Sequence, residues 1–395
     1  MRAHSRFRAL LALFIAFGIG APWPSEAQQP IRIGSSLSLT GKYALQGGYG
    51  REGYLLCQKQ VNQTGGVLGR SVEFVIDDDG SEEKTAVRLY EKLITEEKVD
   101  AVLGPYGSPI TDAVADITEK HRKLMIAPFA ATTSLWEKGR RYLVMLLSPV
   151  EVVPEGVLDL AARNGLKTLA VLNEDALGGK AAAKGASELA KKKGLQLVFS
   201  ETYPKGTTDF SGKLNQVKAA KPDVLYAAIF LLDDLVAITR QTRELDLNVK
   251  MFGTVVYGAL PEYYQRLGTS AEYVYSSSLW EPGLPNPGNQ AFVTAYEQEF
   301  NRAPALQSVN GYAGCQLFVE AARRAGSLDS DKLREALLKL RTRTLLGDFA
   351  IDERGFQIGH KAVTIQWQDG KQVVVWPDEL ASGKPRFPTP PWSGR

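Results

Sequence analysis

The sequence predicts an α/β protein made of two similar lobes, each a parallel sheet covered by helices. Short runs of β-branched residues alternate with amphipathic segments of helical length, the pattern of parallel strands joined by helical crossovers. After Pro149 this alternation starts again, so a second unit of the same kind follows the first. A chain of 395 residues with 44% hydrophobic content is long and apolar enough for two such cores.

The first unit alternates four strands with three helices. Thr64-Gly65-Gly66 ends its first helix, because glycine favours helix termination. The strands are expected at 31–37, 71–79, 100–105 and 124–128, and the helices at 48–62, 81–97 and 108–120.

The second unit repeats the alternation and then departs from it. Three consecutive helical segments follow its last strand, and an antiparallel hairpin with an Asp369-Gly370 turn comes after them. The Pro-rich tail 377–395 is expected to lie extended over the surface or to be disordered. The helices are expected at 153–164, 179–193, 210–219, 233–245, 288–300, 308–325 and 331–340, and the strands at 168–173, 195–203, 224–230, 251–254 and 272–278.

Residues 1–27 have the composition of a secretory signal peptide. Arg2, Arg6 and Arg8 make a basic start, the following apolar run is too short to span a bilayer comfortably, and Ser25-Glu26-Ala27 is a small-x-small cleavage site. We therefore expect export and cleavage after Ala27 rather than an N-terminal membrane anchor.

The net charge of the chain after cleavage is close to zero. Without residues 1–27 the chain loses three arginines and one glutamate, which leaves a net charge of +1 and gives no electrostatic reason to expect nucleic acid or an anionic membrane as a partner.

Cys57 and Cys315 both lie in helical patterns, where buried free thiols are the expected state and a disulfide is the alternative.

Gly48-Tyr49-Gly50-Arg51-Glu52-Gly53 matches the G-x-G-x-x-G pattern of dinucleotide-binding proteins. That function needs the first glycine directly after the first strand, whereas about ten residues separate strand 31–37 from Gly48. The match is therefore rejected. The glycines still allow a backbone to approach closely, because glycine has no Cβ atom.

Catalytic and metal-binding patterns are scarce. Neither His121 nor His360 has a nearby partner in a nucleophile arrangement, and no P-loop, zincin or paired C-x-x-C motif occurs. The acidic run 76–80 lacks the glutamate of a calcium loop, so its carboxylates are expected to be solvated or capping. We expect no cofactor, no metal and no enzymatic activity, with an enzyme of unrecognised site as the third alternative.

Six segments in order resemble the branched-chain-amino-acid-binding family of periplasmic proteins that serve ABC transporters. Four of them are LSLTGKYALQGGYG, VDAVLGPYGS, LMIAPFAATTS and VLNEDALGG, and the similarity runs from about Ile31 to about Trp376. The resemblance implies the type I periplasmic binding fold, in which three hinge crossovers join two Rossmann-like lobes and the ligand binds between them. It also implies a periplasmic location, a monomer, and transient docking on ABC permease subunits. A soluble exported sensor with the same fold is the second alternative.

The resemblance also assigns the lobes. The crossovers would fall near 146–152, 277–283 and 345–350. The first lobe would comprise 28–148 and 280–346, and the second 149–279 and 347–376.

Family positions imply a site for a small carboxylate. Ser108, at a helix start, and backbone N–H groups from Ala130 to Thr133 would hold the carboxylate by neutral dipoles. Ser108 could instead only cap its helix, and Phe230 could be plain core. The implied residues are Gln46, Ser108, Ala130, Ala131 and Thr132 from the first lobe, and Leu177, Phe230, Val255 and Tyr257 from the second.

Val255 stands where amino-acid-binding members of the family carry an acid for the ligand's ammonium group. A buried ammonium without an acidic partner is costly, so the sequence favours an aromatic acid or a branched oxo acid over an amino acid. The alternative is that Asp233, Asp234 or Glu281 replaces the missing acid.

Overall fold

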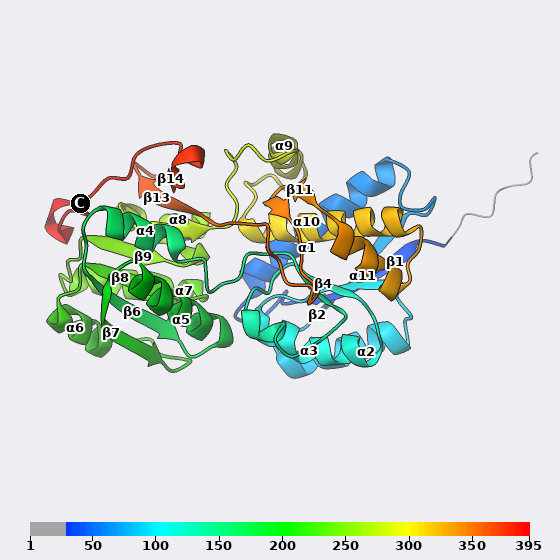
Figure 1. Cartoon of the computed structure of the whole chain (residues 1–395), viewed down its shortest axis with the longest axis horizontal. Coiled ribbons are helices and arrows are strands. Elements are labelled where there is room, and N and C mark those ends of the chain that lie inside the picture. Colours follow the sequence, from blue (N-terminus) through cyan, green and yellow to red (C-terminus); the bar gives the residue numbers. More distant parts are fainter. Residues whose placement is uncertain (1–28) are drawn as a thin grey trace, which may run out of the picture.

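The structure is a computed structural model that describes residues 29–395, so the predicted signal peptide lies outside the described residues. Two lobes lie side by side and are linked by a few chain segments (Figure 1). The N-terminal elements and the helices near residue 300 form one lobe, while the middle of the chain and its C-terminal strands form the other. The predicted α/β class with two sheet-and-helix lobes is confirmed.

The first lobe is built on a parallel five-stranded sheet in the order β2-β1-β3-β4-β5. Its strands are β1 (Ile31–Leu37), β2 (Val72–Asp78), β3 (Ala101–Leu103), β4 (Met125–Ala127) and β5 (Leu143–Met145). Its helices are α1 (Ala44–Gln63), α2 (Glu83–Thr95), α3 (Ser108–Lys120), α9 (Asn289–Phe300), α10 (Leu306–Ala325) and α11 (Ser330–Lys339), and a small hairpin pairs β11 (Thr342–Thr344) with β12 (Gly347–Phe349).

The second lobe has a seven-stranded sheet in the order β14-β13-β10-β9-β8-β6-β7. The strands β6 to β10 are parallel, and the final hairpin adds two antiparallel strands at one edge. The strands are β6 (Thr168–Glu174), β7 (Gln196–Tyr203), β8 (Val224–Ala228), β9 (Met251–Thr254), β10 (Tyr275–Ser278), β13 (Val363–Gln368) and β14 (Lys371–Trp376), and the helices are α4 (Glu155–Arg163), α5 (Leu177–Lys192), α6 (Ser211–Ala220), α7 (Leu232–Glu244) and α8 (Pro261–Leu267).

The chain passes between the two sheets three times, after β5, after β10 and before β13. We propose that the third passage comes later than the expected 345–350, because the segment after β12 still contacts the first lobe. Gly355 accepts a hydrogen bond from the N–H of Met145 (2.8 Å), and the side chain of Gln357 donates to the carbonyl of Leu146 (3.0 Å). We therefore propose that the first lobe extends to Gln357 rather than to residue 346.

Helices α1 and α10 pack against each other so closely that their contact requires glycine. A Cβ atom on Gly53 would lie 2.0 Å from the carbonyl oxygen of Ser308, and one on Gly50 would lie 2.8 Å from the ring of Phe129. A Cβ on Gly311 of α10 would lie 2.5 Å from the carbonyl oxygen of Gly50. The G-x-G-x-x-G match therefore serves helix packing, although Gly48 itself faces open space.

The same pair of helices carries a disulfide between Cys57 and Cys315, whose Cα atoms are 6.3 Å apart. The expectation of free thiols was wrong here. The second crossover returns α9–α11 to the first lobe and places α10 beside α1, so a separation of 258 residues in sequence becomes a contact in space.

The tail after β14 lies extended on the second lobe, as one of the two expectations had it. The indole of Trp392 is buried and donates to the carbonyl of Leu247 (2.9 Å), and the N–H of Thr389 donates to the carbonyl of Lys250 (3.0 Å). Within residues 29–395, no helix is both long and apolar enough to cross a membrane.

Candidate functional site

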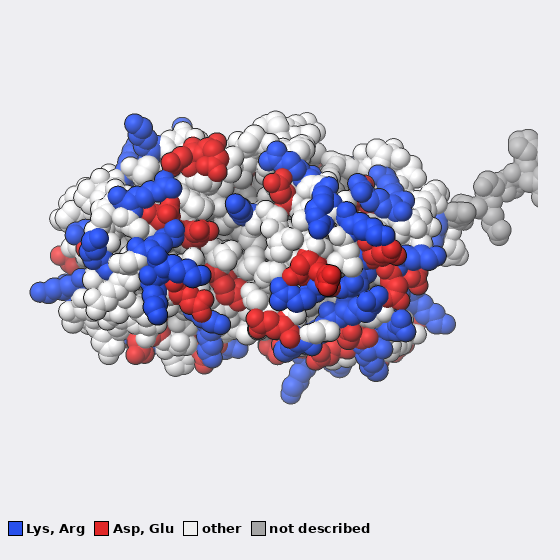
Figure 2. All heavy atoms as spheres, viewed as in Figure 1, with Lys and Arg blue, Asp and Glu red and all other residues white. Residues whose placement is uncertain are grey.

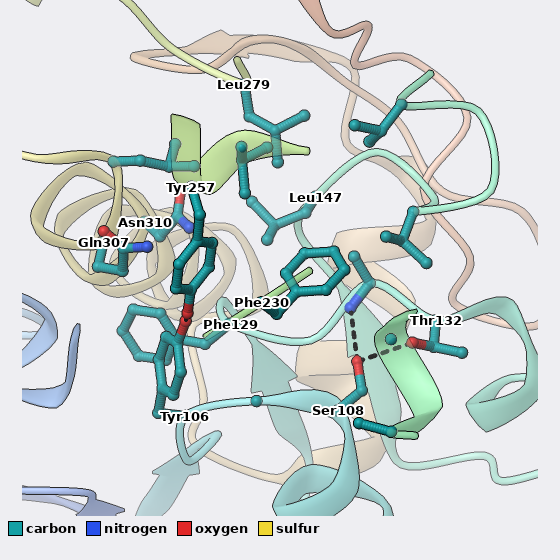
Figure 3. A pocket seen from close by; sticks show the side chains of 18 of the residues that line it. Tyr106, Ser108, Phe129, Thr132, Leu147, Phe230, Tyr257, Leu279, Gln307 and Asn310 are labelled. Carbon is teal, nitrogen blue, oxygen red and sulfur yellow. Dashed lines mark hydrogen bonds between the residues drawn. The ribbon is translucent and has the colours of Figure 1, made fainter. Parts of the chain in front are cut away.

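A cavity lies between the two lobes, at the carboxyl ends of parallel strands from both sheets (Figure 3). Open α/β sheets place ligands at this edge, because the loops that follow the strands converge there. The free volume inside this cavity is about 90 Å³. It is lined by Tyr43, Tyr106, Ser108, Phe129, Ala131, Thr132, Gln307 and Asn310 from the first lobe, by Glu174, Ala176, Gly178, Phe230, Val256 and Tyr257 from the second, and by Leu147, Ser148, Val150, Val153 and Leu279 near the crossovers.

One end of the cavity is suited to an anion. Ser108 is the first residue of α3, and its hydroxyl accepts hydrogen bonds from the hydroxyl of Thr132 (2.9 Å) and the N–H of Ala131 (3.3 Å) (Figure 3). No hydrogen bond from this hydroxyl caps α3; Gly107 occupies the N-cap position. The first N–H groups of a helix have no acceptor within the helix, and the helix dipole makes that end positive.

Part of the predicted set of carboxylate donors is already in use. The N–H of Thr133 donates to the carboxylate of Glu151 (3.1 Å), and the N–H of Ala131 donates to Ser108. Thr132 likewise donates its hydroxyl proton to Ser108 (2.9 Å), so the hydroxyl of Ser108 and the start of α3 are the groups best placed for a ligand carboxylate.

The body of the cavity is aromatic. The rings of Phe230 and Tyr257 meet edge to face with centroids 5.7 Å apart, and Tyr106 lies between Tyr43 and Phe129 at 5.4 and 5.9 Å. The hydroxyls of Tyr106 and Tyr257 point toward each other and form a hydrogen bond between the lobes (Figure 3). Such walls bury an apolar or aromatic ligand body well.

Glu174 adds a carboxyl group to this mostly apolar cavity. It is the last residue of β6 and is 3% exposed, and its Oε2 atom has no hydrogen-bond partner. Burial raises the pKa of Glu174 to about 8, although a backbone hydrogen bond from Phe230 acts in the opposite direction. The raised pKa favours the neutral form of this carboxyl group.

Five of the predicted site residues line this cavity, namely Ser108, Ala131, Thr132, Phe230 and Tyr257. Four others do not.

Ala130 and Val255 are buried in the core, and in each case the next residue in the chain lines the cavity instead. Successive residues of an extended chain point to opposite sides, so an alignment that is off by one residue selects the wrong face. Near position 255 it is Val256, rather than the predicted Val255, that lines the cavity.

Gln46 and Leu177 also lie outside the cavity lining. Gln46 lines a second, adjoining cavity between the lobes, and Leu177 packs partly buried at the start of α5 between two cavity residues, Ala176 and Gly178.

Asp233, Asp234 and Glu281 were the three candidates to replace a missing acid at Val255. None of them lines the cavity that contains Ser108 and Phe230. Asp234 accepts a hydrogen bond from Tyr203 (2.9 Å), and Asp233 pairs with Arg266 (2.6 Å). Glu281 is buried in the second crossover, beside Ser278. The acid in the cavity is Glu174, which was not among the predicted site residues although it directly follows the predicted strand 168–173.

Gln307 and Asn310 were missed for a different reason. They lie one turn apart on α10 and face the cavity (Figure 3). No local pattern marks them, because only the return of α10 to the first lobe brings this helix to the ligand site.

The described residues contain no cluster of three or more His, Cys, Asp or Glu side chains that could hold a metal ion. The acidic run at the end of β2 has a structural role. Asp79 accepts hydrogen bonds from the hydroxyls of Ser36 (2.8 Å) and Ser38 (2.7 Å), and Asp78 accepts from the N–H of Leu39 (2.9 Å). Basic and acidic residues are interspersed over the face in Figure 2, without a large patch of one sign.

Comparisons with known proteins agree with this architecture. The family model described as periplasmic binding protein matches residues 30–372. A Leu/Ile/Val-binding protein homolog of Brucella suis is 24% identical over 401 residues, which is 96% of this chain and 99% of the relative. Among solved structures, a leucine-binding protein from Thermotoga maritima superimposes with a TM-score of 0.80 at 24% identity, covering 87% of this chain and 97% of that one. A solute-binding protein of an ABC transporter from Rhodopseudomonas palustris, in complex with 3,4-dihydroxybenzoic acid, gives 0.78 at 24% identity, covering 87% and 95%. The chain belongs to the periplasmic binding protein family.

Proposed function

We propose that this protein captures a small carboxylate between its lobes and delivers it to the permease subunits of an ABC importer. Proteins of this family are binding components of such transporters and not enzymes. One observation carries the proposal: a single cavity combines a helix-start anion site from the first lobe with aromatic walls from both lobes. We further propose that the protein acts as a monomer and is exported through residues 1–27.

The mechanism is closure of the lobes around the ligand. A ligand that touches both lobes binds the closed form better than the open form, and shifts the population toward it by that difference in affinity. A micromolar dissociation constant corresponds to about 8 kcal/mol, which exceeds an opening bias of a few kcal/mol. The closed form is then the species that docks on the permease.

The ligand class follows from the lining. Aromatic walls beside an anion site suit an aromatic acid or a branched acid, and the similar proteins named above include one with an aromatic acid bound and one named for leucine. With Val255 at the family's acidic position, an amino acid would have no acidic partner there for its ammonium group. Because Glu174 supplies a carboxyl group at another position, amino acids return to the proposed ligands.

Small-angle scattering combined with a thermal-shift screen tests this function. The screen should include leucine, valine, phenylalanine, benzoate, 3,4-dihydroxybenzoate and 4-methyl-2-oxopentanoate. We expect at least one of these acids to raise the melting temperature and to lower the radius of gyration. A ligand that binds without compaction would contradict the closure mechanism, and binding of none would contradict the ligand class.

A further inference from the structure

We propose that Glu174, Gln307 and Asn310 form an acceptor subsite that selects ligands carrying a hydrogen-bond donor, an ammonium or a hydroxyl group, in addition to the carboxylate. This inference rests on the proposed function and narrows its ligand class. The subsite is defined by these three residues.

The observation behind it is a concentration of unpaired acceptor atoms. Within residues 29–395, Oε2 of Glu174, Oε1 of Gln307 and Oδ1 of Asn310 are buried without a hydrogen-bond partner, and all three residues line the same cavity. A buried polar atom left unpaired costs about 1–3 kcal/mol, so native proteins keep few of them. Three in one cavity indicate that a ligand supplies the partners.

The three side chains are held in place by the fold. Each is 3% exposed. Gly179 leaves room for Glu174, since a Cβ there would lie 2.6 Å from its Cγ atom. Gln307 and Asn310 are fixed on one face of α10 (Figure 3).

No neighbouring cation accounts for the carboxyl group. The ion pairs of the described residues do not include Glu174, and Lys42 and Lys205 act on it only at longer range. A half-turn of either amide would exchange its oxygen for its nitrogen, and a protonated Glu174 carries one O–H donor, but the ionised carboxylate that a ligand ammonium favours has two oxygens that only accept. The proposed subsite therefore depends mainly on the carboxylate of Glu174, and the side-chain oxygens of Gln307 and Asn310 are additional acceptors.

The subsite also couples recognition to closure. Glu174 belongs to the second lobe, and the two amides belong to α10 of the first lobe. Because all three line one cavity, a ligand whose donor groups reach residues of both lobes completes these hydrogen bonds only when the lobes are closed.

A ligand ammonium and a ligand hydroxyl differ in whether their binding releases a proton from Glu174. A ligand ammonium favours the ionised carboxylate, so Glu174 gives up its proton, which passes to the buffer as the ligand binds. A ligand hydroxyl donates to a carboxyl oxygen without requiring ionisation. Proton release on binding therefore distinguishes the two sources.

Isothermal titration calorimetry at pH 7 on the mature full-length protein tests the subsite with two matched pairs of acids. Leucine is paired with 4-methylpentanoate, and 3,4-dihydroxybenzoate is paired with benzoate. In the wild type we expect the donor-bearing member of at least one pair to bind about tenfold tighter or more than its partner, the range for hydrogen bonds to a charged group. Titration in two buffers of different ionisation enthalpy measures the released protons.

Two variants and a control assign the effect to Glu174. Glu174→Met, which removes both oxygens, should abolish the preference. Glu174→Gln keeps one neutral acceptor, so it should lose affinity for leucine and retain affinity for the dihydroxy acid. Asp175→Asn changes the next residue, an exposed carboxylate paired with Lys180, and should leave every affinity unchanged.

The outcomes separate the two proposals. Equal binding within both pairs in the wild type, or a preference that survives in Glu174→Met, would overturn the subsite while leaving carboxylate capture standing. A failure of all four acids to bind would overturn the proposed carboxylate ligand, and the subsite with it. Circular dichroism and benzoate binding report whether each variant is folded.

Discussion

The backbone N–H of Ser148 donates a hydrogen bond of 3.1 Å to Nδ1 of His360, a buried ring between the lobes. Nε2 of the same ring lies 3.1 Å from the carbonyl oxygen of Leu279, and the hydroxyl of Ser148 donates to the carbonyl of His360 (2.7 Å). These residues belong to the first, second and third passages between the lobes, so one imidazole joins all three. Because Nδ1 accepts, the neutral ring with its proton on Nε2 is the form that fits.

This arrangement predicts a loss of stability in acid. Burial lowers the pKa of His360 to about 4, against about 6.5 in the unfolded chain. Between these values the unfolded chain binds a proton that the native protein does not, so stability falls as the pH drops from about 6.5 toward 4. The contribution approaches about 3 kcal/mol at the lower end.

Urea unfolding at several pH values, with wild type and His360→Gln side by side, measures this contribution. The glutamine keeps a donor and an acceptor but does not titrate, so its stability should fall less steeply across this range. Many carboxylates titrate below pH 5, and the comparison cancels their effect. Parallel curves for the two proteins would show that His360 is not responsible.

Ser108→Ala tests the anion site. The alanine removes a hydroxyl at the start of α3, and we expect carboxylate affinity to weaken by about 1.5–3 kcal/mol while the fold stays intact. Calorimetry with the tightest acid of the screen measures the change. Ser187→Ala, on the outer part of α5, removes a hydroxyl bonded only to its own helix and should bind as the wild type does. Unchanged affinity in Ser108→Ala would place the carboxylate elsewhere.

The sequence predicted most of the fold because long strands and helices repeat with clear periods. The elements it missed are short: β5 has three residues and α8 has seven, too few to show a period. The third passage, which we propose lies after Gln357, has no local signal in the sequence, because nothing local distinguishes a segment that stays on one lobe from one that leaves it.

Part of the candidate site could be predicted because its residues follow the ends of recognisable strands. Ser108, Thr132 and Phe230 follow strand ends, where ligands bind in this class of sheet. Glu174 satisfies the same rule, and only the choice of family positions over strand ends left it out. Gln307 and Asn310 depend on where α10 lies in space, which no spacing in the sequence records.

The disulfide between Cys57 and Cys315 predicts a redox-dependent stability. It closes a loop of 258 residues between α1 and α10, and such a cross-link typically stabilises a protein by about 2–4 kcal/mol. The double variant Cys57→Ser, Cys315→Ser should unfold at a lower urea concentration than the oxidised wild type and should no longer respond to reductant. Ligand affinity should not change, because neither cysteine lines the cavity. Equal stability of the oxidised and reduced wild type would contradict this.

Gly48 and Gly53, five residues apart within α1, predict opposite effects of the same substitution. A Cβ atom at position 53 would meet the carbonyl oxygen of Ser308 at 2.0 Å, so Gly53→Ala forces α1 and α10 apart and should destabilise the protein by about 1–3 kcal/mol or more. Gly48 has no atom within 4 Å of that position, so Gly48→Ala only improves helix propensity and should stabilise by about 0.5–1 kcal/mol. Urea unfolding of both variants measures the signs directly. If these glycines formed a nucleotide site, the wild type would bind a nucleotide and both substitutions would abolish that binding. We expect no nucleotide binding by the wild type. Unchanged stability of Gly53→Ala would contradict the packing role of Gly53.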